Sequence, residues 1–449
     1  MSKSSSSALS SHFGSISRRD FLGRSVAGGL GALFHPLSSY AAGTDSGDGP
    51  ILVVIHQAGG NDSLNTVIPY DRADSSFYYG ERPTMGIGGA DVLSLSEGLG
   101  FNPALPQLKS IWDDGDLAIV NGVGNPNPTL SHFRSIDIWE SATAEGSQES
   151  GWLGRFFDHQ CAAEGAVAPL SGIEARSRSS LAFRNEGPGS ALTVNDPAFF
   201  DLVHDPLGGA TASSFDSVFF RTMMERLNGM TPQGSMSDRR ALDFVRETTG
   251  AAYSGSRDFQ GILDQADLDF PHSNFPNTPI GSDLANIARY INGGAPTSTY
   301  HAVQGGYDTH AGQFSGNPLA GRHTDLLSSF DGAIGAFAAE MKRQGKWDRV
   351  ILLSYSEFGR KVPENGGSGT DHGAAGSLFV AGGGVSPGMH GAFPSLAPDD
   401  RVLNNSLAMT TDFRSVYRTI LEQGMGLESQ AVLNILKTTN EEVPLLGFY

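Results

Sequence analysis

The sequence predicts an α/β fold with a doubly wound, mostly parallel sheet that carries helices on both faces. Short runs such as Ile51–Ile55 are continuously apolar and rich in β-branched residues, which is typical of strands buried on both faces of a parallel sheet. Segments with helical spacing of apolar residues lie between these runs, and such alternation is typical of α/β proteins. With 449 residues, 39% of them hydrophobic, the chain is long enough for a large core.

The first part of the chain is expected to supply two strands and two helices. The second helix should begin near Ser131 and place Phe133, Ile136 and Trp139 on one face, because these residues share a helical spacing. The expected elements are a strand at Ile51–Ile55, a helix at Pro103–Trp112, a strand at Leu117–Val120 and the helix after Ser131.

The middle of the chain, about residues 160–290, is less regular and is expected to form a partly helical insertion or a cap. Its helices are expected at Phe215–Leu227, Asp238–Thr248 and Ser282–Ile291, the last with Ser282 as N-cap. The clear pattern then resumes with a strand at Thr299–Val303, a helix at Leu326–Met341, strands at Val350–Leu353 and Ser377–Ala381, and a terminal helix at Asp412–Gln423. Residues 42–449 are therefore expected to form one domain.

The charge balance excludes several classes of partner. The formal net charge is -18, and no cluster of Lys and Arg lies in the body of the chain. Such a surface repels nucleic acid and anionic lipid. No window approaches the roughly 18 apolar residues of a membrane span. An anionic substrate would therefore need local positive charge, which a bound metal ion supplies.

The N-terminus carries a basic pattern of its own. Ser17-Arg18-Arg19-Asp20-Phe21-Leu22-Gly23 precedes a weakly apolar stretch at 26–34, and small residues surround Ala41. A twin arginine before such a stretch indicates a twin-arginine export signal. Residues 1–41 are therefore expected to be a signal peptide read by the twin-arginine export machinery, and the mature protein is expected to be periplasmic or secreted.

Polar residues that suit a metal or anion site follow four of the expected strands. In open α/β sheets, ligands bind beyond the carboxyl ends of the strands. Carboxylates and imidazoles suit zinc, calcium, magnesium or manganese. The alternative is that the aspartates cap turns and the histidines are structural. The candidates are His56 and Asp62 after the first strand, Thr129, Ser131 and His132 after the second, Asp308 and His310 after the third, and Glu357, Asp371 and His372 after the fourth.

Ser131 has two interpretations because it lies where a helix is expected to begin. It is either an N-cap that accepts a backbone hydrogen bond or a nucleophile activated by a metal ion. His132 is either a partner in this chemistry or a structural histidine. A Ser-His-Asp triad is the weaker option.

Six motifs in order carry a resemblance to a known family. The chain resembles the exported bacterial family catalogued as domain of unknown function fifteen-hundred-and-one, which is placed near the alkaline phosphatase and sulfatase superfamily. The resemblance covers essentially the whole mature chain and implies an alkaline-phosphatase-like fold. The motifs are Ser17–Leu22, Gly59–Thr66, Ser131–Ser135, Gly305–His310, Ser356–Arg360 and Gly369–Gly373.

The superfamily resemblance implies roles for several of these residues. Asp62 matches its metal-binding acid, Ser131 or Thr129 its nucleophile, and Asp308, His310 and His372 its metal ligands. Glu357-Phe358-Gly359 stands in place of an Asp-His-Gly motif. A phenyl ring cannot ligate a metal ion. Either one metal remains, or Asp371 and His372 build a different site, or catalysis has been lost.

Two functions follow as hypotheses. The first is an exported metal-dependent hydrolase of phosphate or sulfate esters, acting on a small anionic ester or a sulfated or phosphorylated glycan. The second is a non-catalytic exported binding or scaffold protein that retains a hydrolase-like fold. The hydrolase hypothesis expects the candidate residues to converge in one pocket, with Arg360 or Arg134 gripping the anion. Its metal ligands are Asp62, Asp308, His310, Glu357, Asp371 and His372, and its catalytic residues are Ser131, Thr129, His132 and Arg360.

Overall fold

The computed structural model describes the chain from residue 49 onward, with gaps. The described residues are 49–144, 148–164, 171–176, 179–187, 191–194, 259, 261–264, 266, 270–440 and 442–449. The expected signal peptide and the helices expected at Phe215–Leu227 and Asp238–Thr248 lie outside them. None of the helices in the described part combines the length and the apolar character that a membrane crossing requires.

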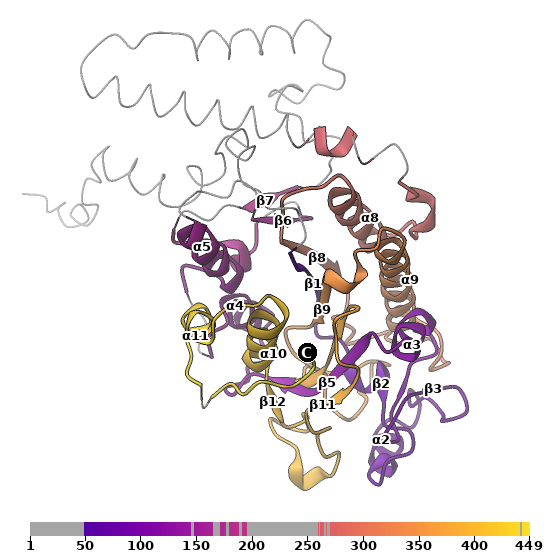
Figure 1. Cartoon of the computed structure of the whole chain (residues 1–449). Coiled ribbons are helices and arrows are strands. Elements are labelled where there is room, and N and C mark those ends of the chain that lie inside the picture. Colours follow the sequence, from indigo (N-terminus) through magenta and orange to yellow (C-terminus); the bar gives the residue numbers. More distant parts are fainter. Residues whose placement is uncertain are drawn as a thin grey trace, which may run out of the picture.

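A mostly parallel sheet of nine strands forms the centre of the described structure (Figure 1). The strand order is β11-β5-β10-β9-β1-β8-β6-β7, and β12 also pairs with β5. Only β10 runs antiparallel to its neighbours β5 and β9 among the described pairs of this sheet. The strands are β1 (Ile51–Ala58), β5 (Leu117–Gly124), β6 (Gly172–Glu174), β7 (Ala191–Thr193), β8 (Thr299–Gly305), β9 (Val350–Tyr355), β10 (Ala375–Ala381), β11 (Gly388–His390) and β12 (Thr411–Asp412).

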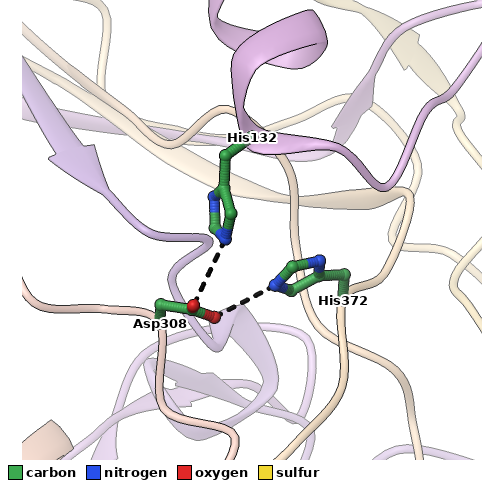
Figure 2. Close-up of side chains that lie close together, drawn as sticks. All are labelled: His132, Asp308 and His372. Atoms are coloured by element: carbon green, nitrogen blue, oxygen red, sulfur yellow. Dashed lines mark hydrogen bonds and ion pairs between the residues drawn. The ribbon is translucent and has the colours of Figure 1, made fainter.

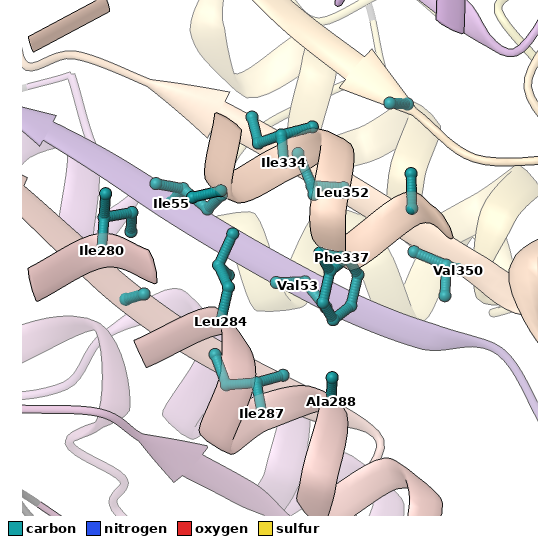
Figure 3. Close-up of a cluster of buried hydrophobic side chains, with 14 of the residues drawn as sticks. Val53, Ile55, Ile280, Leu284, Ile287, Ala288, Ile334, Phe337, Val350 and Leu352 are labelled. Carbon is teal, nitrogen blue, oxygen red and sulfur yellow. The ribbon is translucent and has the colours of Figure 1, made fainter. Parts of the chain in front are cut away.

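Helices cover both faces of this sheet, so the predicted α/β class is confirmed (Figure 1). Val53 and Ile55 of β1 pack toward one layer of helices (Figure 3), and Leu52 and Val54 pack toward the other. Each fully buried side chain of this kind contributes about 1.5–3 kcal/mol. The first layer contains α3 (Pro106–Asp113), α8 (Pro279–Asn292) and α9 (Arg322–Arg343), and the second contains α4 (His132–Ser141), α5 (Trp152–Glu164), α10 (Phe413–Thr419) and α11 (Ser429–Leu436).

A smaller three-stranded sheet lies beside the main one. It comprises β2 (Val67–Ile68), β4 (Gly100–Phe101) and β3 (Leu93–Ser94), and the helix α2 (Ser75–Glu81) belongs to the same region. Ile68 of β2 and Tyr78 of α2 belong to a third buried cluster with Val362 and Leu396, whereas Val67 and Phe101 belong to the first cluster. The short helical turns are η3 (Ser63–Asn65), η4 (Leu181–Phe183), η6 (His272–Asn274), η7 (Trp347–Arg349), η8 (Pro398–Asp400) and the π-helical η9 (Ile420–Gly424).

Two local predictions are wrong. Helix α8 is capped by Thr278, whose hydroxyl accepts a hydrogen bond from the Gly281 amide at 3.2 Å, and not by Ser282. Pro279 explains this start, because proline suits the first helical position. The helix capped by Asp412 is not the last one, since α11 follows it. Phe133 does not face the core but is 86% exposed, because α4 packs through Ile138 and Trp139.

The topology brings four strand ends to one edge of the sheet. β1 pairs in parallel with β8 and β9, and β5 is antiparallel to β10, which is antiparallel to β9. The carboxyl ends of β1, β5, β8 and β9 therefore point the same way. Gly59 follows β1 with φ +123°, and a Cβ there would lie 2.3 Å from the amide nitrogen of Asp308. Only glycine permits this approach of the two loops.

Candidate metal centre

His132, Asp308 and His372 form a compact cluster at this edge of the sheet (Figure 2). His132 is the first residue of α4, Asp308 follows β8, and His372 precedes β10. Nε2 of His372 lies 3.0 Å from Oδ1 of Asp308, and Nε2 of His132 lies 3.4 Å from its Oδ2. One ligand atom from each residue lies within 4.8 Å of the others. The three residues can therefore share one ion.

The opposite ring nitrogens of both histidines are held by acceptors. Nδ1 of His132 donates to Oε1 of Glu357 at 2.8 Å, and Nδ1 of His372 donates to the Leu130 carbonyl at 2.8 Å. In the neutral imidazoles this leaves a lone pair on each Nε2, facing the Asp308 carboxylate. Nε2 of His132 is buried and has no hydrogen-bond partner among the described residues. Three electron-rich groups that face one another fit a cation between them, and such backing of ligating histidines is usual in metal sites.

Glu357 supports the cluster without facing it. Both of its oxygens accept hydrogen bonds inside the protein, from His132, from Nε2 of His56 at 3.0 Å and from the Gly59 amide at 2.9 and 3.1 Å. Burial alone would raise the pKa of Glu357, but the hydrogen bonds from both histidines outweigh it and hold this pKa well below its ordinary value. In return, the hydrogen bond to Glu357 raises the pKa of His132. Glu357 is therefore a charged carboxylate, and it orients His132.

His310 adds a third imidazole nitrogen beside the cluster. Its Nε2 lies 2.8 Å from Nε2 of His372 and 3.1 Å from Oδ1 of Asp308. Its Nδ1 lies 3.4 Å from Oδ1 of Asp371, so Asp371 lies behind His310 as Glu357 lies behind His132. A tetrahedral zinc ion with bonds of about 2.0–2.1 Å separates its ligand atoms by about 3.3 Å. Four pairs of these atoms, which join His310 to His372 and Asp308 to each of the three histidines, are 2.8–3.4 Å apart and so are close to that value.

The cluster opens to solvent on one side. The side chains of Asp308 and His310 are 47% and 45% exposed, whereas that of His372 is 17% exposed. Burial alone would raise the pKa of Asp308, but the neighbouring His372 and the guanidinium group of Arg360 lower it to about 2. Asp308 is therefore charged at neutral pH, and a small molecule can reach it from solvent.

Arg360 is buried and its donors are used inside the protein. Nη2 donates to Oδ1 of Asp308 at 2.8 Å, which fixes that carboxylate. The expectation that Arg360 grips an anionic substrate does not fit this arrangement, because its guanidinium group is satisfied by the loops. Its other hydrogen bonds go to the backbone carbonyls of Gly59, Gly60, Tyr307 and Thr370.

Asp62 lies apart from the cluster. Arg82 binds its carboxylate through two nitrogens at 2.6 and 3.0 Å, and Nε2 of Gln313 donates to it at 2.5 Å. Burial would raise the pKa of Asp62, but the charge and hydrogen bonds of Arg82 lower it. The expected convergence of all candidates therefore holds for Asp308, His310 and His372 but not for Asp62, whose oxygens are already occupied.

The two hydroxyl candidates lie next to His132. Ser131 takes the N-cap position of α4, but its hydroxyl makes no capping hydrogen bond within the described residues, so the capping interpretation does not account for it. The side chain of Ser131 is exposed. Oγ1 of Thr129 accepts the Ser131 amide at 3.3 Å. Ser131 therefore offers an accessible hydroxyl at a helix N-terminus, whereas Thr129 braces the turn before it.

Phe358 stands where the resemblance to the superfamily implies a ligating histidine, and its phenyl ring cannot bind a second metal ion. Its buried ring lies 4.9 Å from the ring centre of His132 and 4.6 Å from that of His372. Gly60, at φ +78°, makes room for it, since a Cβ there would lie 2.4 Å from the phenyl ring. Phe358 therefore forms an apolar wall behind the two imidazoles. Sequence reasoning gave neither this contact nor the placement of His132 among the ligand atoms.

Comparisons with known proteins give distant likenesses. No curated protein matches this sequence. Among solved structures, a protein in the alkaline phosphatase superfamily from Vibrio parahaemolyticus matches with a TM-score of 0.34 and 10% identity, over 89% of this chain and 71% of that one. A phosphonate monoester hydrolase from Silicibacter pomeroyi matches with a TM-score of 0.35 and 11% identity, over 88% of this chain and 78% of that one. A sulfatase from Pseudoalteromonas sp. matches with a TM-score of 0.34 and 11% identity, over 91% of this chain and 71% of that one. Likenesses this loose carry no argument about function.

A family model matches the part of the chain that holds three of the four clustered side chains. The match covers residues 298–436, from β8 through α11. It includes the motifs Gly305–His310, Ser356–Arg360 and Gly369–Gly373. The resemblance predicted from the sequence is therefore confirmed for residues 298–436, which match the family described as "Protein of unknown function (DUF1501)".

Proposed function

We propose that this protein is a metal-dependent hydrolase of phosphate or sulfate esters, with one divalent ion bound by His132, Asp308, His310 and His372. The observation that carries the proposal is the buried Nε2 of His132, which makes no hydrogen bond within the described residues and lies 3.4 Å from the Asp308 carboxylate, beside the Nε2 of His372. Three imidazoles and one carboxylate are the ligand types of zinc. The ester class rests on the resemblance of the ordered sequence motifs to the phosphatase and sulfatase superfamily.

The surrounding residues have definable tasks in such a reaction. A divalent ion, when bound, would polarise the ester oxygen and lower the pKa of a nucleophile. Glu357 and the Leu130 carbonyl hold His132 and His372 in the tautomers that a ligand requires. Ser131 presents its hydroxyl at the N-terminus of α4, where backbone amides favour a transferred anion. We assign Ser131 as the nucleophile.

One observation favours a second candidate, a metal-holding protein that binds an anionic ligand without cleaving it. Arg360 already donates hydrogen bonds to Asp308 and to four backbone carbonyls, so it has no donor left to bind a transferred anion. Lys361 lies 3.4 Å from Asp371 and is paired with it. With these two cations engaged, the ion itself would carry most of the attraction for an anion.

The deciding experiment measures bound metal and turnover together. Wild type, His372→Ala and the control His390→Ala are purified without chelator. Metal content and hydrolysis of 4-nitrophenyl phosphate and 4-nitrophenyl sulfate are then measured. His390 is the matched control, because it bonds the carbonyls of Ser386 and Leu446 and is not in the cluster.

We expect about one ion per chain and measurable turnover in wild type and His390→Ala, and loss of both in His372→Ala. A metal-free wild type would refute the site. A wild type that holds metal but cleaves neither ester would favour the binding protein.

We also propose that the protein is exported by the twin-arginine route and acts in the periplasm or outside the cell. The support is Arg18-Arg19 before a weakly apolar stretch. Replacing both arginines with lysine should keep the protein in the cytoplasm, as shown by cell fractionation. Normal export of the Lys-Lys variant would contradict the proposal.

A further inference from the structure

Gln313 joins the loops that carry the clustered residues. Its side chain is 2% exposed and lies between β8 and α9. Its Oε1 accepts hydrogen bonds from Oγ1 of Thr309 at 3.0 Å and from Oγ1 of Thr370 at 2.7 Å. Its Nε2 donates to Oδ2 of Asp62 at 2.5 Å. One amide therefore connects the segments that follow β1, β8 and β9.

The two threonines lie next to the clustered side chains in sequence. Thr309 stands between Asp308 and His310, and Thr370 immediately precedes Asp371 and His372. The backbones of the same segments are also bonded, since the Thr370 amide donates to the Thr309 carbonyl at 3.2 Å. Any shift of one threonine hydroxyl relative to the other therefore changes the distance between the two loops.

An amide is the side chain that this position requires. It must donate to a carboxylate and accept from two hydroxyl groups, and a glutamine does both. A glutamate in its place would set a second carboxylate against Asp62, and two like charges at this distance repel. Asp62 is itself held by Arg82, so the amide is fixed to a rigid point.

We propose that Gln313 is a positioning residue that sets the separation of His310 and His372 and thereby the affinity of the site for a divalent ion. The two Nε2 atoms lie 2.8 Å apart across these loops. The inference rests on the proposed function, because it assumes that the cluster binds metal. Outer partners of ligating residues typically change metal affinity by about 10- to 100-fold.

The test uses pairs of variants at the two threonines, which disturb the fold less than removal of Gln313. Thr309→Val and Thr370→Val keep the side-chain shape but remove the hydroxyl group, whereas Thr309→Ser and Thr370→Ser keep it. Each protein is stripped of metal and titrated with Zn²⁺ and with Co²⁺, whose visible spectrum reports the ligand geometry. Urea unfolding of the metal-free proteins is measured in parallel.

We expect the two valine variants to bind both ions about 10- to 100-fold more weakly, with a changed Co²⁺ spectrum, and the serine variants to match wild type. Valine variants that lose stability when metal-free but bind both ions as wild type does would overturn the inference alone, since a purely structural role predicts that result. A wild type that binds neither ion would overturn the proposed site and the inference with it.

Discussion

Substitution of the buried His323 should remove a measurable part of the pH dependence of stability. His323 is 3% exposed, and its Nε2 lies 2.9 Å from Oδ1 of Asn61. Burial is the main cause that lowers the pKa of His323 from 6.5 to about 4, although the charge of Asp62 acts in the opposite direction. The imidazole is therefore neutral in the folded protein at pH 7 and donates to Asn61.

The sign and size of the effect follow from these two pKa values. Below pH 6.5 the unfolded chain binds a proton at His323, whereas the folded chain does so only below about pH 4. Stability is therefore intact above pH 6.5 and falls as the pH drops toward 4. The full loss is about 3 kcal/mol, of which about 2.5 kcal/mol should be gone by pH 4.5.

The assay compares urea unfolding free energies at pH 7.5 and pH 4.5 for wild type, His323→Gln and His159→Gln. His159 is the control because it lies exposed on α5. Between the two pH values, wild type and His159→Gln should lose about 2.5 kcal/mol more than His323→Gln, even if His323→Gln is less stable at both. An equal loss in all three proteins would refute the reasoning, because it would mean that His323 does not titrate differently in the folded and unfolded states.

Three further predictions concern the cluster and its surroundings. Glu357→Gln should weaken Zn²⁺ binding about 10- to 100-fold, because an amide has only one oxygen and cannot accept a hydrogen bond from each flanking histidine on a separate oxygen. Unchanged binding in a metal titration would contradict the orienting role of Glu357. Ser131→Ala should remove most ester turnover while the unfolding free energy changes by less than about 0.5 kcal/mol. Thr129→Ala should keep turnover. An active Ser131→Ala variant would exclude Ser131 as the nucleophile. Phe133→Ala should change the unfolding free energy by less than about 0.5 kcal/mol, since this side chain is 86% exposed, and a larger loss in urea unfolding would show a packing role.

The longer strands could be predicted from the sequence, but their directions could not. Ile51–Ile55 and Val350–Leu353 are buried on both faces and read as apolar runs. The strand at Ser377–Ala381 was also expected. Its antiparallel pairing with both neighbours could not be predicted, because an apolar run carries no information about the direction of the strand. Strands of two or three residues, such as β6 and β7, carry no periodic pattern and depend on their neighbours in the sheet.

The candidate site was predictable where strand order decided it. Asp308, His310 and His372 were expected because they follow strands that end at one edge, and the structure brings them together. His132 was expected at the same edge, but as a catalytic or structural histidine. Its place among the ligand atoms depends on Glu357, which is 225 positions away and is joined to it only by the fold. Asp62 is not among the clustered ligand atoms. Its carboxylate is bound by Arg82, which follows α2 outside the main sheet.

The place of β1 in the sheet has a consequence for the order in which the chain can fold. β1 lies near the start of the described chain, yet both of its neighbours in the sheet, β8 and β9, come from its second half. At about 5–20 residues per second, a ribosome needs roughly 15 to 60 seconds to synthesise the roughly 300 residues between β1 and β9. Until β8 and then β9 have been synthesised, β1 lacks one or both of its neighbours in the sheet, and unpaired apolar segments aggregate or bind chaperones. The candidate centre, which depends on the ends of β1, β8 and β9, therefore forms only after almost the whole chain has left the ribosome. A chain exported in the folded state would have to wait in the cytoplasm until this late step is complete.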